Sequence, residues 1–326
     1  MSLMFYSCKS LKVLDLSNFD TSQVENNAYL FCNCQKLKSL NISNFNTSQV
    51  KNMNGMFYNC RSLISLNISN FDTSLVTNMN QMFYYCTNLT SLNINNFKTS
   101  NVNNMVRMFT HCPSLKSLDL SNFDTSNVIK MNGMFAYCES LSLLNLSNFN
   151  TSRIQNMSAI FSNCRNLSLL DISNFNTSNA TEMRYMFYKC SSLNYLNLSN
   201  FDTSNVQKMD NMFNNCSSLI SLDISNLNIS SVQNMDRMFY NCPSLRTLYL
   251  SNFDISNNDM FNKSHNEEYI NLILSNSNSK IKDIFLLTYP FLTICIKNND
   301  NISINSSLFT KINIFCNYNK EYLKII

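Results

Sequence analysis

The sequence is poor in the residues that many catalytic and nucleotide-binding sites require. It has two glycines, two histidines (His111 and His265) and no tryptophan among its 326 residues. A Gly-rich phosphate-binding loop needs several bare backbone positions close together, so two glycines argue against this class of site. Two histidines leave little for histidine-based catalysis or for a histidine-rich metal site. We therefore expect no cofactor and no metal.

Charged residues are scarce as well. Only 13% of the residues are charged, and 24 Lys+Arg against 20 Asp+Glu give a formal net charge of +4. Nucleic-acid binding is expected of a clustered basic face. Such a weak and diluted charge does not predict a nucleic acid as partner.

Cysteine is abundant, with 13 residues, and its spacing is regular. Only Cys32, Cys295 and Cys316 lie outside one series. The other ten recur with one constant period and without a slip: Cys8, Cys34, Cys60, Cys86, Cys112, Cys138, Cys164, Cys190, Cys216 and Cys242. A fixed period in the range of about 20–50 residues indicates a solenoid or a related repeat array.

Residues 63–88 illustrate one repeat. Leu66 and Ile68 lie two residues apart, as on one face of a short strand. Residues 70–74 are rich in Asn, Asp, Thr and Ser, whose side chains bond nearby backbone and favour a turn. The remaining apolar positions have the spacing i, i+3, i+4 and i+7, which predicts a short helix with one apolar stripe: Met79, Met82, Phe83 and Cys86.

One such repeat cannot bury both of its apolar faces, but stacked repeats can form a continuous core. We therefore predict an α/β solenoid of about ten repeats, each with one short parallel β-strand and one short helix. The solenoid is expected over residues 1–261, and it opens inside a repeat without an N-terminal cap. That opening is expected of a fragment of a longer protein or of an end that docks on a partner.

Residues 262–326 are expected to hold a degenerate repeat and a β-rich C-terminal cap. Tyr269, Leu272 and Leu274 resemble an eleventh strand. The apolar run Ile284–Ile296 is too short to span a bilayer as a helix, so we predict no membrane span. Association of this run with a membrane is the alternative to the cap.

The Leu-x-x-Leu-x-Leu pattern of the strand resembles the leucine-rich repeat. The Asn-Phe-Asp-Thr-Ser turn and the Met-Phe-x-x-Cys ending resemble the BspA-like branch, which includes bacterial surface proteins and mycoplasma lipoproteins. The match covers about residues 1–261. This resemblance implies adhesion, a protein or cell-surface ligand and a location at the cell surface. No signal peptide is visible in the sequence.

The cysteine series has a structural interpretation. Each cysteine ends an apolar stripe, where a buried thiol acts as a small hydrophobic side chain. Disulfides along the series and a metal site are less favoured, since stacked Cβ vectors run parallel. Cys295 and Cys316 have no place in the stripe, and they could form one disulfide if the protein is extracellular.

The polar columns also have structural interpretations. Two columns carry mainly Asp or Asn, one that begins at Asp15 in the strand and one that begins at Asp20 in the turn. In neither column do two neighbouring repeats both carry Asp, as expected if adjacent carboxylates repel. A cation site or a glycosidase-like carboxylate pair is the alternative. The Thr column is expected to bond to backbone rather than to form an ice-binding face. A tyrosine set follows the buried Phe and predicts either a convex aromatic stripe or packing between repeats: Tyr6, Tyr58, Tyr84, Tyr188 and Tyr240.

The third position of the Leu-x-x-Leu-x-Leu pattern, which is Ser65 in the repeat shown above, varies in an informative way. Its side chain is expected to point outward, opposite the buried Leu, and it is usually Ser. Three successive repeats replace this Ser with Leu143, Leu169 and Tyr195, and Tyr249 lies near the same end. Exposed apolar patches with an aromatic residue often mark partner sites. We predict that these four residues bind a protein or peptide ligand.

The sequence therefore predicts a non-catalytic binding module that uses its concave strand face. An intracellular interaction scaffold of the same fold is the first alternative, and a signal peptide upstream would separate the two. A carbohydrate-active solenoid enzyme is a more remote alternative, because it requires an asymmetric carboxylate cluster. The sequence predicts no particular oligomeric state.

Overall fold

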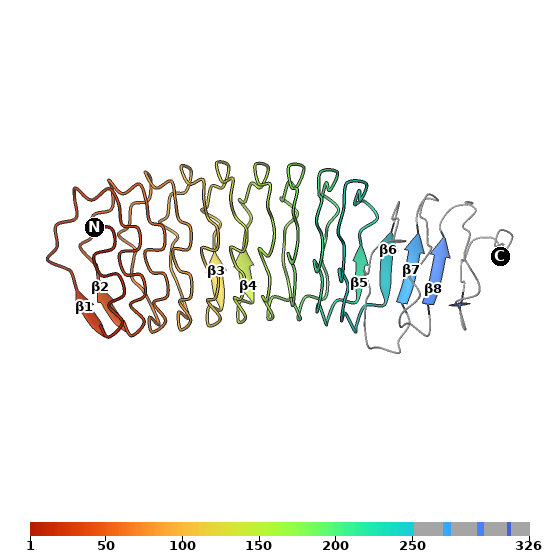
Figure 1. The fold of residues 1–326 in the computed structure, drawn as a ribbon, viewed down its shortest axis with the longest axis horizontal. Coiled ribbons are helices and arrows are strands. Elements are labelled where there is room, and N and C mark those ends of the chain that lie inside the picture. Colours follow the sequence, from red (N-terminus) through yellow and green to blue (C-terminus); the bar gives the residue numbers. More distant parts are fainter. Residues whose placement is uncertain (251–269, 275–291, 297–311, 314–326) are drawn as a thin grey trace.

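The fold was analysed in a computed structural model that describes residues 1–250, 270–274, 292–296 and 312–313. The described part is an elongated solenoid whose coils stack side by side along the long axis (Figure 1). Each coil corresponds to one sequence repeat, so equivalent residues of neighbouring coils lie next to each other. The predicted repeat architecture is confirmed.

Short parallel strands form one side of the stack. Six of them lie in the coils: β1 (Val13–Asp15), β2 (Ser39–Asn41), β3 (Ser117–Asp119), β4 (Leu143–Asn145), β5 (Ser221–Asp223) and β6 (Thr247–Leu250). Within the coils they pair as β1–β2, β3–β4 and β5–β6, always between equivalent residues of two successive repeats. The equivalent segments 65–67, 91–93, 169–171 and 195–197 are not regular strands.

The sheet continues beyond the tenth coil. Strands β7 (Ile270–Leu274), β8 (Leu292–Ile296) and β9 (Ile312–Asn313) join β5 and β6 in one parallel five-stranded sheet. Strand β7 lies where an eleventh strand is expected, and it pairs with β6. The interval between paired residues shortens at each step, as Thr247 pairs with Asn271, Ile270 with Leu292 and Leu292 with Ile312. The predicted role of residues 262–326 as a cap stays a prediction.

The predicted helix is wrong for the described residues. The segment equivalent to residues 79–86 consists of consecutive turns in every coil. Each coil has two residues with positive φ in this segment, such as Gln81 (55°) and Tyr85 (59°). Positive φ at the third residue of a four-residue turn is the geometry of type II turns, and it interrupts an α-helix.

Hydrogen bonds between coils explain why turns replace the helix. The N–H groups of Met79, Gln81, Phe83 and Tyr85 donate to carbonyls of the next coil, at 2.9–3.0 Å. The N–H groups between them close the turns, for example from Met82 to the Met79 carbonyl. In a helix all of these N–H groups would bond internally. Moreover, helices pack about 8–10 Å apart, whereas strands stack at about 4.8 Å. Turns let both sides of the coil stack at a similar spacing.

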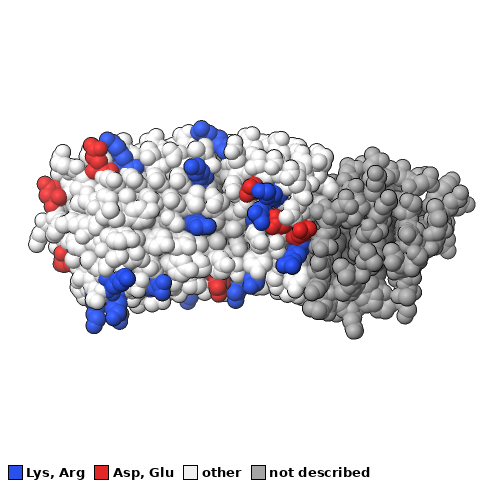
Figure 2. All heavy atoms as spheres, in the orientation of Figure 1, with Lys and Arg blue, Asp and Glu red and all other residues white. Residues whose placement is uncertain are grey.

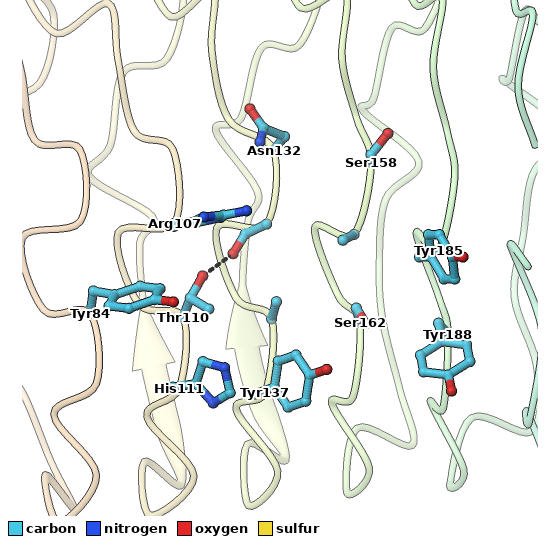
Figure 3. Close-up of a pocket in the computed structure, with 13 residues that line it drawn as sticks. Tyr84, Arg107, Thr110, His111, Asn132, Tyr137, Ser158, Ser162, Tyr185 and Tyr188 are labelled. Carbon is cyan, nitrogen blue, oxygen red and sulfur yellow. Dashed lines mark hydrogen bonds between the residues drawn. The ribbon is translucent and has the colours of Figure 1, made fainter.

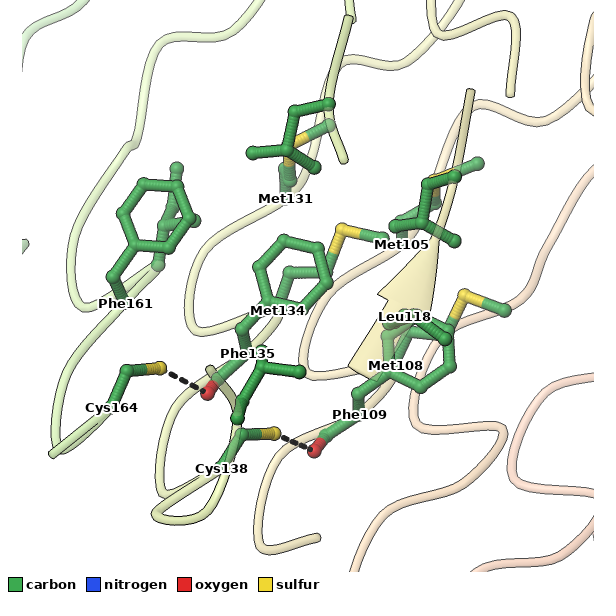
Figure 4. Close-up of a cluster of buried hydrophobic side chains, with 14 of the residues drawn as sticks. Met105, Met108, Phe109, Leu118, Met131, Met134, Phe135, Cys138, Phe161 and Cys164 are labelled. Carbon is green, nitrogen blue, oxygen red and sulfur yellow. Dashed lines mark hydrogen bonds between the residues drawn. The ribbon is translucent and has the colours of Figure 1, made fainter. Parts of the chain in front are cut away.

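Columns of identical side chains fill the space between the strands and the turns (Figure 4). Met79, Met82, Phe83 and Cys86 are at most 1% exposed, so the predicted apolar stripe is buried although it is not helical. The Phe rings stack in a continuous series with centroids 5.4–5.9 Å apart. Each buried Phe contributes about 1.5–3 kcal/mol of hydrophobic stabilisation.

Candidate functional site

The strand face presents the predicted outward residues. We use the name strand face for the surface formed by the third and fifth positions of the Leu-x-x-Leu-x-Leu pattern. In β4 the exposed Leu143 and Asn145 flank Leu144, which packs against the core. This is the alternation that a strand imposes, since successive side chains point to opposite faces.

Three large apolar side chains are exposed in consecutive coils. Leu143 is 70% exposed, Leu169 74% and Tyr195 64%. The equivalent position faces solvent as Ser in β2 and β3, where Ser39 pairs with Val13 and Ser117 pairs with Leu143. The structure therefore brings these three residues together on one surface, which we call the apolar row. Nothing in the core requires them to be apolar.

Tyr249 lies apart from the apolar row. It is 38% exposed in β6, where it pairs with Asp223 and Ile273. The coil between Tyr195 and Tyr249 carries Ser221 at the row position. Sequence analysis missed Ile220, which directly precedes β5 and is 54% exposed. Ile220 occupies the second position of the Leu-x-x-Leu-x-Leu pattern, which is Lys or Arg in several other coils. Comparing this position between repeats could have indicated that Ile220 is exposed.

Local hydrogen bonds hold the carboxylates beside the apolar row. Asp171 Oδ1 accepts the backbone N–H of Ser173 at 3.0 Å. Hydrogen bonds from the hydroxyl and the N–H of Ser173 lower the pKa of Asp171 below its ordinary value. The same Asx turn recurs at Asp15, Asp119 and Asp223. In the part of the chain that the structure describes, no three His, Cys, Asp or Glu side chains are grouped to hold a metal ion. The Asx turns give the carboxylates of this column a structural role.

The thiols of the cysteine series donate hydrogen bonds inside the core. Cys138 Sγ donates to the Phe109 carbonyl of the preceding coil at 3.1 Å, and Cys164 Sγ to the Phe135 carbonyl at 3.2 Å (Figure 4). The eleven cysteines within residues 1–250 are free, and the prediction of buried thiols is confirmed for the series from Cys34 to Cys242. Burial raises the pKa of Cys138 to about 12. The predicted disulfide between Cys295 and Cys316 stays a prediction, because Cys316 lies outside the described residues.

The threonine column is buried and bonds to backbone, as predicted. Thr125 Oγ1 donates to the Asn150 carbonyl at 2.9 Å and accepts the Asn150 N–H at 2.7 Å. The hydroxyl thus inserts into the hydrogen-bond ladder between two coils. A hydroxyl occupied in this way cannot belong to a flat ice-binding surface.

The molecule carries few charges with which to attract a partner. Figure 2 shows a face whose described atoms belong mostly to uncharged residues. Within the described residues, four ion pairs join equivalent positions of neighbouring coils: Lys51–Glu25, Arg165–Glu139, Arg184–Asp210 and Lys208–Glu182. In the pairs of Lys51, Arg165 and Lys208 both side chains are 31–64% exposed, so each of these pairs adds at most about 1 kcal/mol to stability. In the Arg184–Asp210 pair the carboxylate is only 4% exposed, so this limit for surface pairs does not apply to it.

The turn segments form a second surface, which we call the turn face. Its rings contact one another along the stack, as in Tyr58–Tyr84 with centroids 4.8 Å apart. Tyr85, His111 and Tyr137 form a further stack, with centroid separations of 4.1 and 4.2 Å. The predicted tyrosine set is therefore an interrupted series, and the rings of Tyr85, His111 and Tyr137 lie beside it.

Among the described residues, no helix is long and apolar enough to cross a bilayer.

The solved structures that show similarity to this fold include two proteins from bacteria. A leucine-rich repeat protein from Bacteroides ovatus aligns with a TM-score of 0.50 at 15% identity, covering 96% of this chain and 86% of that protein. A leucine rich cell surface protein from Faecalibacterium prausnitzii aligns with a TM-score of 0.40 at 15% identity, covering 90% and 75%. The first supports the leucine-rich repeat fold. A comparison with curated protein sequences found no match.

A family model also matches the repeats, in three overlapping segments. They cover residues 1–92, 86–169 and 157–275, which is most of the solenoid. The matched family is described as a mycoplasma protein of unknown function, DUF285. Its agreement with the resemblance to BspA-like repeats confirms that prediction at the level of family. The chain belongs to the DUF285 family of leucine-rich repeat proteins.

Proposed function

We propose that the chain is a non-catalytic recognition module at a cell surface, and that its strand face binds a protein ligand. The observation that supports this most is the apolar row, where Leu143, Leu169 and Tyr195 are 64–74% exposed in three consecutive coils. Contiguous exposed apolar surface is costly in water and typically marks a partner site.

The proposed ligand presents an apolar side chain or an apolar strand edge to the row. Tyr195 supplies a large, rigid ring with a polar tip, a residue type enriched among interface hot spots. The polar coils on either side would surround this contact, as the polar rim of an interface does. Ile220 and Tyr249 extend the contact toward β6. A cell-surface location is inferred from the resemblance to BspA-like surface proteins.

Replacing the row tests this function. The triple variant Leu143→Ser, Leu169→Ser, Tyr195→Ser restores the residue that Ser39, Ser65 and Ser117 already carry at this position. It is therefore expected to fold with an unchanged thermal midpoint. We expect its affinity for the partner to fall at least about 100-fold, because hot-spot residues contribute about 2 kcal/mol or more each.

The partner is first identified by affinity capture with the intact chain, and its dissociation constant is then measured with purified components. A matched control removes apolar surface elsewhere through Ile64→Ser, Leu75→Ser and Ile129→Ser, which are 41–58% exposed outside the row. The control is expected to bind as the unmodified chain does. The proposal is contradicted if the row variant binds the partner as tightly as the unmodified chain does. It is also contradicted if every captured protein binds the row variant and the control variant equally well.

A further inference from the structure

The tyrosine series on the turn face has a gap in the middle of the stack. The residue that follows the buried Phe is Tyr in five coils, but three consecutive coils carry Thr110, Ala136 and Ser162. These three side chains are only 4–5% exposed. They lie between Tyr84 on one side and Tyr188 on the other. Three coils therefore lack the ring that would cover this surface.

A pocket of about 530 Å³ opens where the rings are missing (Figure 3). Tyr84 stands at one end, and Tyr185 and Tyr188 stand at the other. Thr110 and Ser162 lie between these ends, together with Gly133, one of the two glycines of the chain. The volume falls within the range of about 300–1,000 Å³ typical of small-molecule sites.

The walls of the pocket are held in place by their neighbours. His111 and Tyr137, which form one edge, stack on each other at 4.2 Å, and Tyr85 stacks on His111 at 4.1 Å. The Thr110 hydroxyl donates to the Gly133 carbonyl. At the far end, Lys189 Nζ lies 5.2 Å from the ring centroid of Tyr188. A ligand would therefore meet rings that are already ordered, which lowers the entropic cost of binding.

The charge of the lining is positive. Arg107 lines the pocket, and none of the lining residues is Asp or Glu. The Arg107 side chain makes no ion pair or hydrogen bond with the described residues. Its stem passes over Gly133, where a Cβ would lie 3.2 Å from Arg107 Cγ. The guanidinium is thus available to a carboxylate, its preferred bidentate partner.

We propose that this pocket binds an acidic sugar, a pyranose ring that carries a carboxylate. The C–H groups of a sugar ring can pack on the electron-rich faces of the tyrosines. Its hydroxyls match the hydroxyls and amides of Thr110, Asn132 and Ser162, and its carboxylate matches Arg107. The site is on the turn face and is independent of the apolar row, so it does not rest on the proposed protein ligand.

The first test fills the pocket with the residue that other coils carry. The intact chain is titrated with glucuronate in a calorimeter, and Ala136→Tyr is compared with it. Ala136→Tyr is expected to fold, because five coils already have Tyr at this position, and to weaken binding at least tenfold. The control Asn214→Tyr adds the same ring at the equivalent position outside the pocket, and it is expected to leave binding unchanged. If Ala136→Tyr does not fold, Ser162→Tyr serves the same purpose.

The second test examines the carboxylate. Arg107→Gln is expected to weaken glucuronate binding about 10- to 100-fold, the range of a charge-assisted hydrogen bond, and glucose is expected to bind both proteins equally weakly. Benzoate tests whether any ring with a carboxylate suffices. The proposal is overturned if glucuronate does not bind, if benzoate binds as tightly as glucuronate, or if Ala136→Tyr and Asn214→Tyr affect binding alike.

Discussion

Single residues in this protein act through repetition. Cys138 would be an ordinary buried thiol in another fold, but here its Sγ donates to the preceding coil and its equivalents do the same from Cys34 to Cys242. The sequence predicted their burial because each cysteine ends an apolar stripe. It did not predict the thiol hydrogen bond, since the acceptor carbonyl belongs to Phe109 of the preceding coil and meets the thiol only after the coils stack.

The buried thiols predict a loss of stability at alkaline pH. Burial raises the pKa of Cys86, Cys138 and Cys190 from 9.0 to about 12. An unfolded chain releases these protons near pH 9, whereas the folded chain retains them. The stabilisation is therefore complete below pH 9 and is lost as the pH rises from 9 to 12.

We expect the thiolate absorbance and the loss of circular dichroism to change together in that pH window. At pH 8, alkylation followed by mass spectrometry is expected to modify the partly exposed Cys8 while sparing Cys60 and Cys138 until denaturant is added. Gradual thiolate formation in a chain that remains folded would contradict this account.

At the scale of the element, hydrogen bonds to the next coil alternate with internal hydrogen bonds that close the turns. The spacing of Met79, Met82, Phe83 and Cys86 suits a helix, and periodicity alone cannot distinguish it from a series of turns that buries the same side chains. The difference is in the backbone, where Gln81 and Tyr85 adopt positive φ. The neighbouring coil requires this conformation, because it accepts the N–H groups that a helix would use internally.

The threonine column provides a test of these contacts between coils. Thr125→Val keeps the shape of the side chain but removes both hydrogen bonds to the backbone of Asn150. The two backbone groups of Asn150 then lose the partner that the buried hydroxyl supplies, so we expect the free energy of unfolding to fall by about 1–3 kcal/mol. Chemical denaturation measures this change.

Thr90→Val is the matched control. The Thr90 hydroxyl makes an exposed hydrogen bond of 3.3 Å to the Ile64 carbonyl, and water can replace it. We expect a change below about 0.5 kcal/mol in this variant. Equal effects of the two variants would show that the buried hydroxyl does not support the ladder.

At the scale of the molecule, the solenoid is quasi-one-dimensional, and each coil contacts its neighbours. The apolar row occupies the coils of Leu143, Leu169 and Tyr195, whereas the pocket spans Tyr84 to Tyr188 on the turn face. Two surfaces of different chemistry can therefore share the same coils, because strand and turn residues belong to different sides of one unit.

Removal of one whole coil is expected to preserve this architecture. Deleting residues 35–60 joins Cys34 to Arg61, which is equivalent to Gln35. The shortened chain is expected to fold, and its unfolding enthalpy and denaturant dependence are expected to fall by roughly a tenth. Scanning calorimetry and urea titration check this outcome.

Deleting residues 35–47, half a coil, is the comparison. It removes Ser39, which pairs with Val13 in the complete chain, and it leaves the next residues out of step with the preceding coil. We therefore expect the coils before the deletion to lose their packing on the coils after it. If both deletions leave the same stability, or if neither protein folds, the description of the coil as the unit of folding is wrong.

The sequence by itself determined the repeat, its period, the buried columns and the exposure of Leu143, Leu169 and Tyr195. Each of these follows from the spacing of apolar and polar residues within one unit, and ten copies repeat the evidence. The tertiary structure decided the turns in place of helices and the pocket between Tyr84 and Tyr188. Both depend on groups one or more coils apart, because hydrogen bonds between coils set the backbone and missing rings in successive coils open the surface.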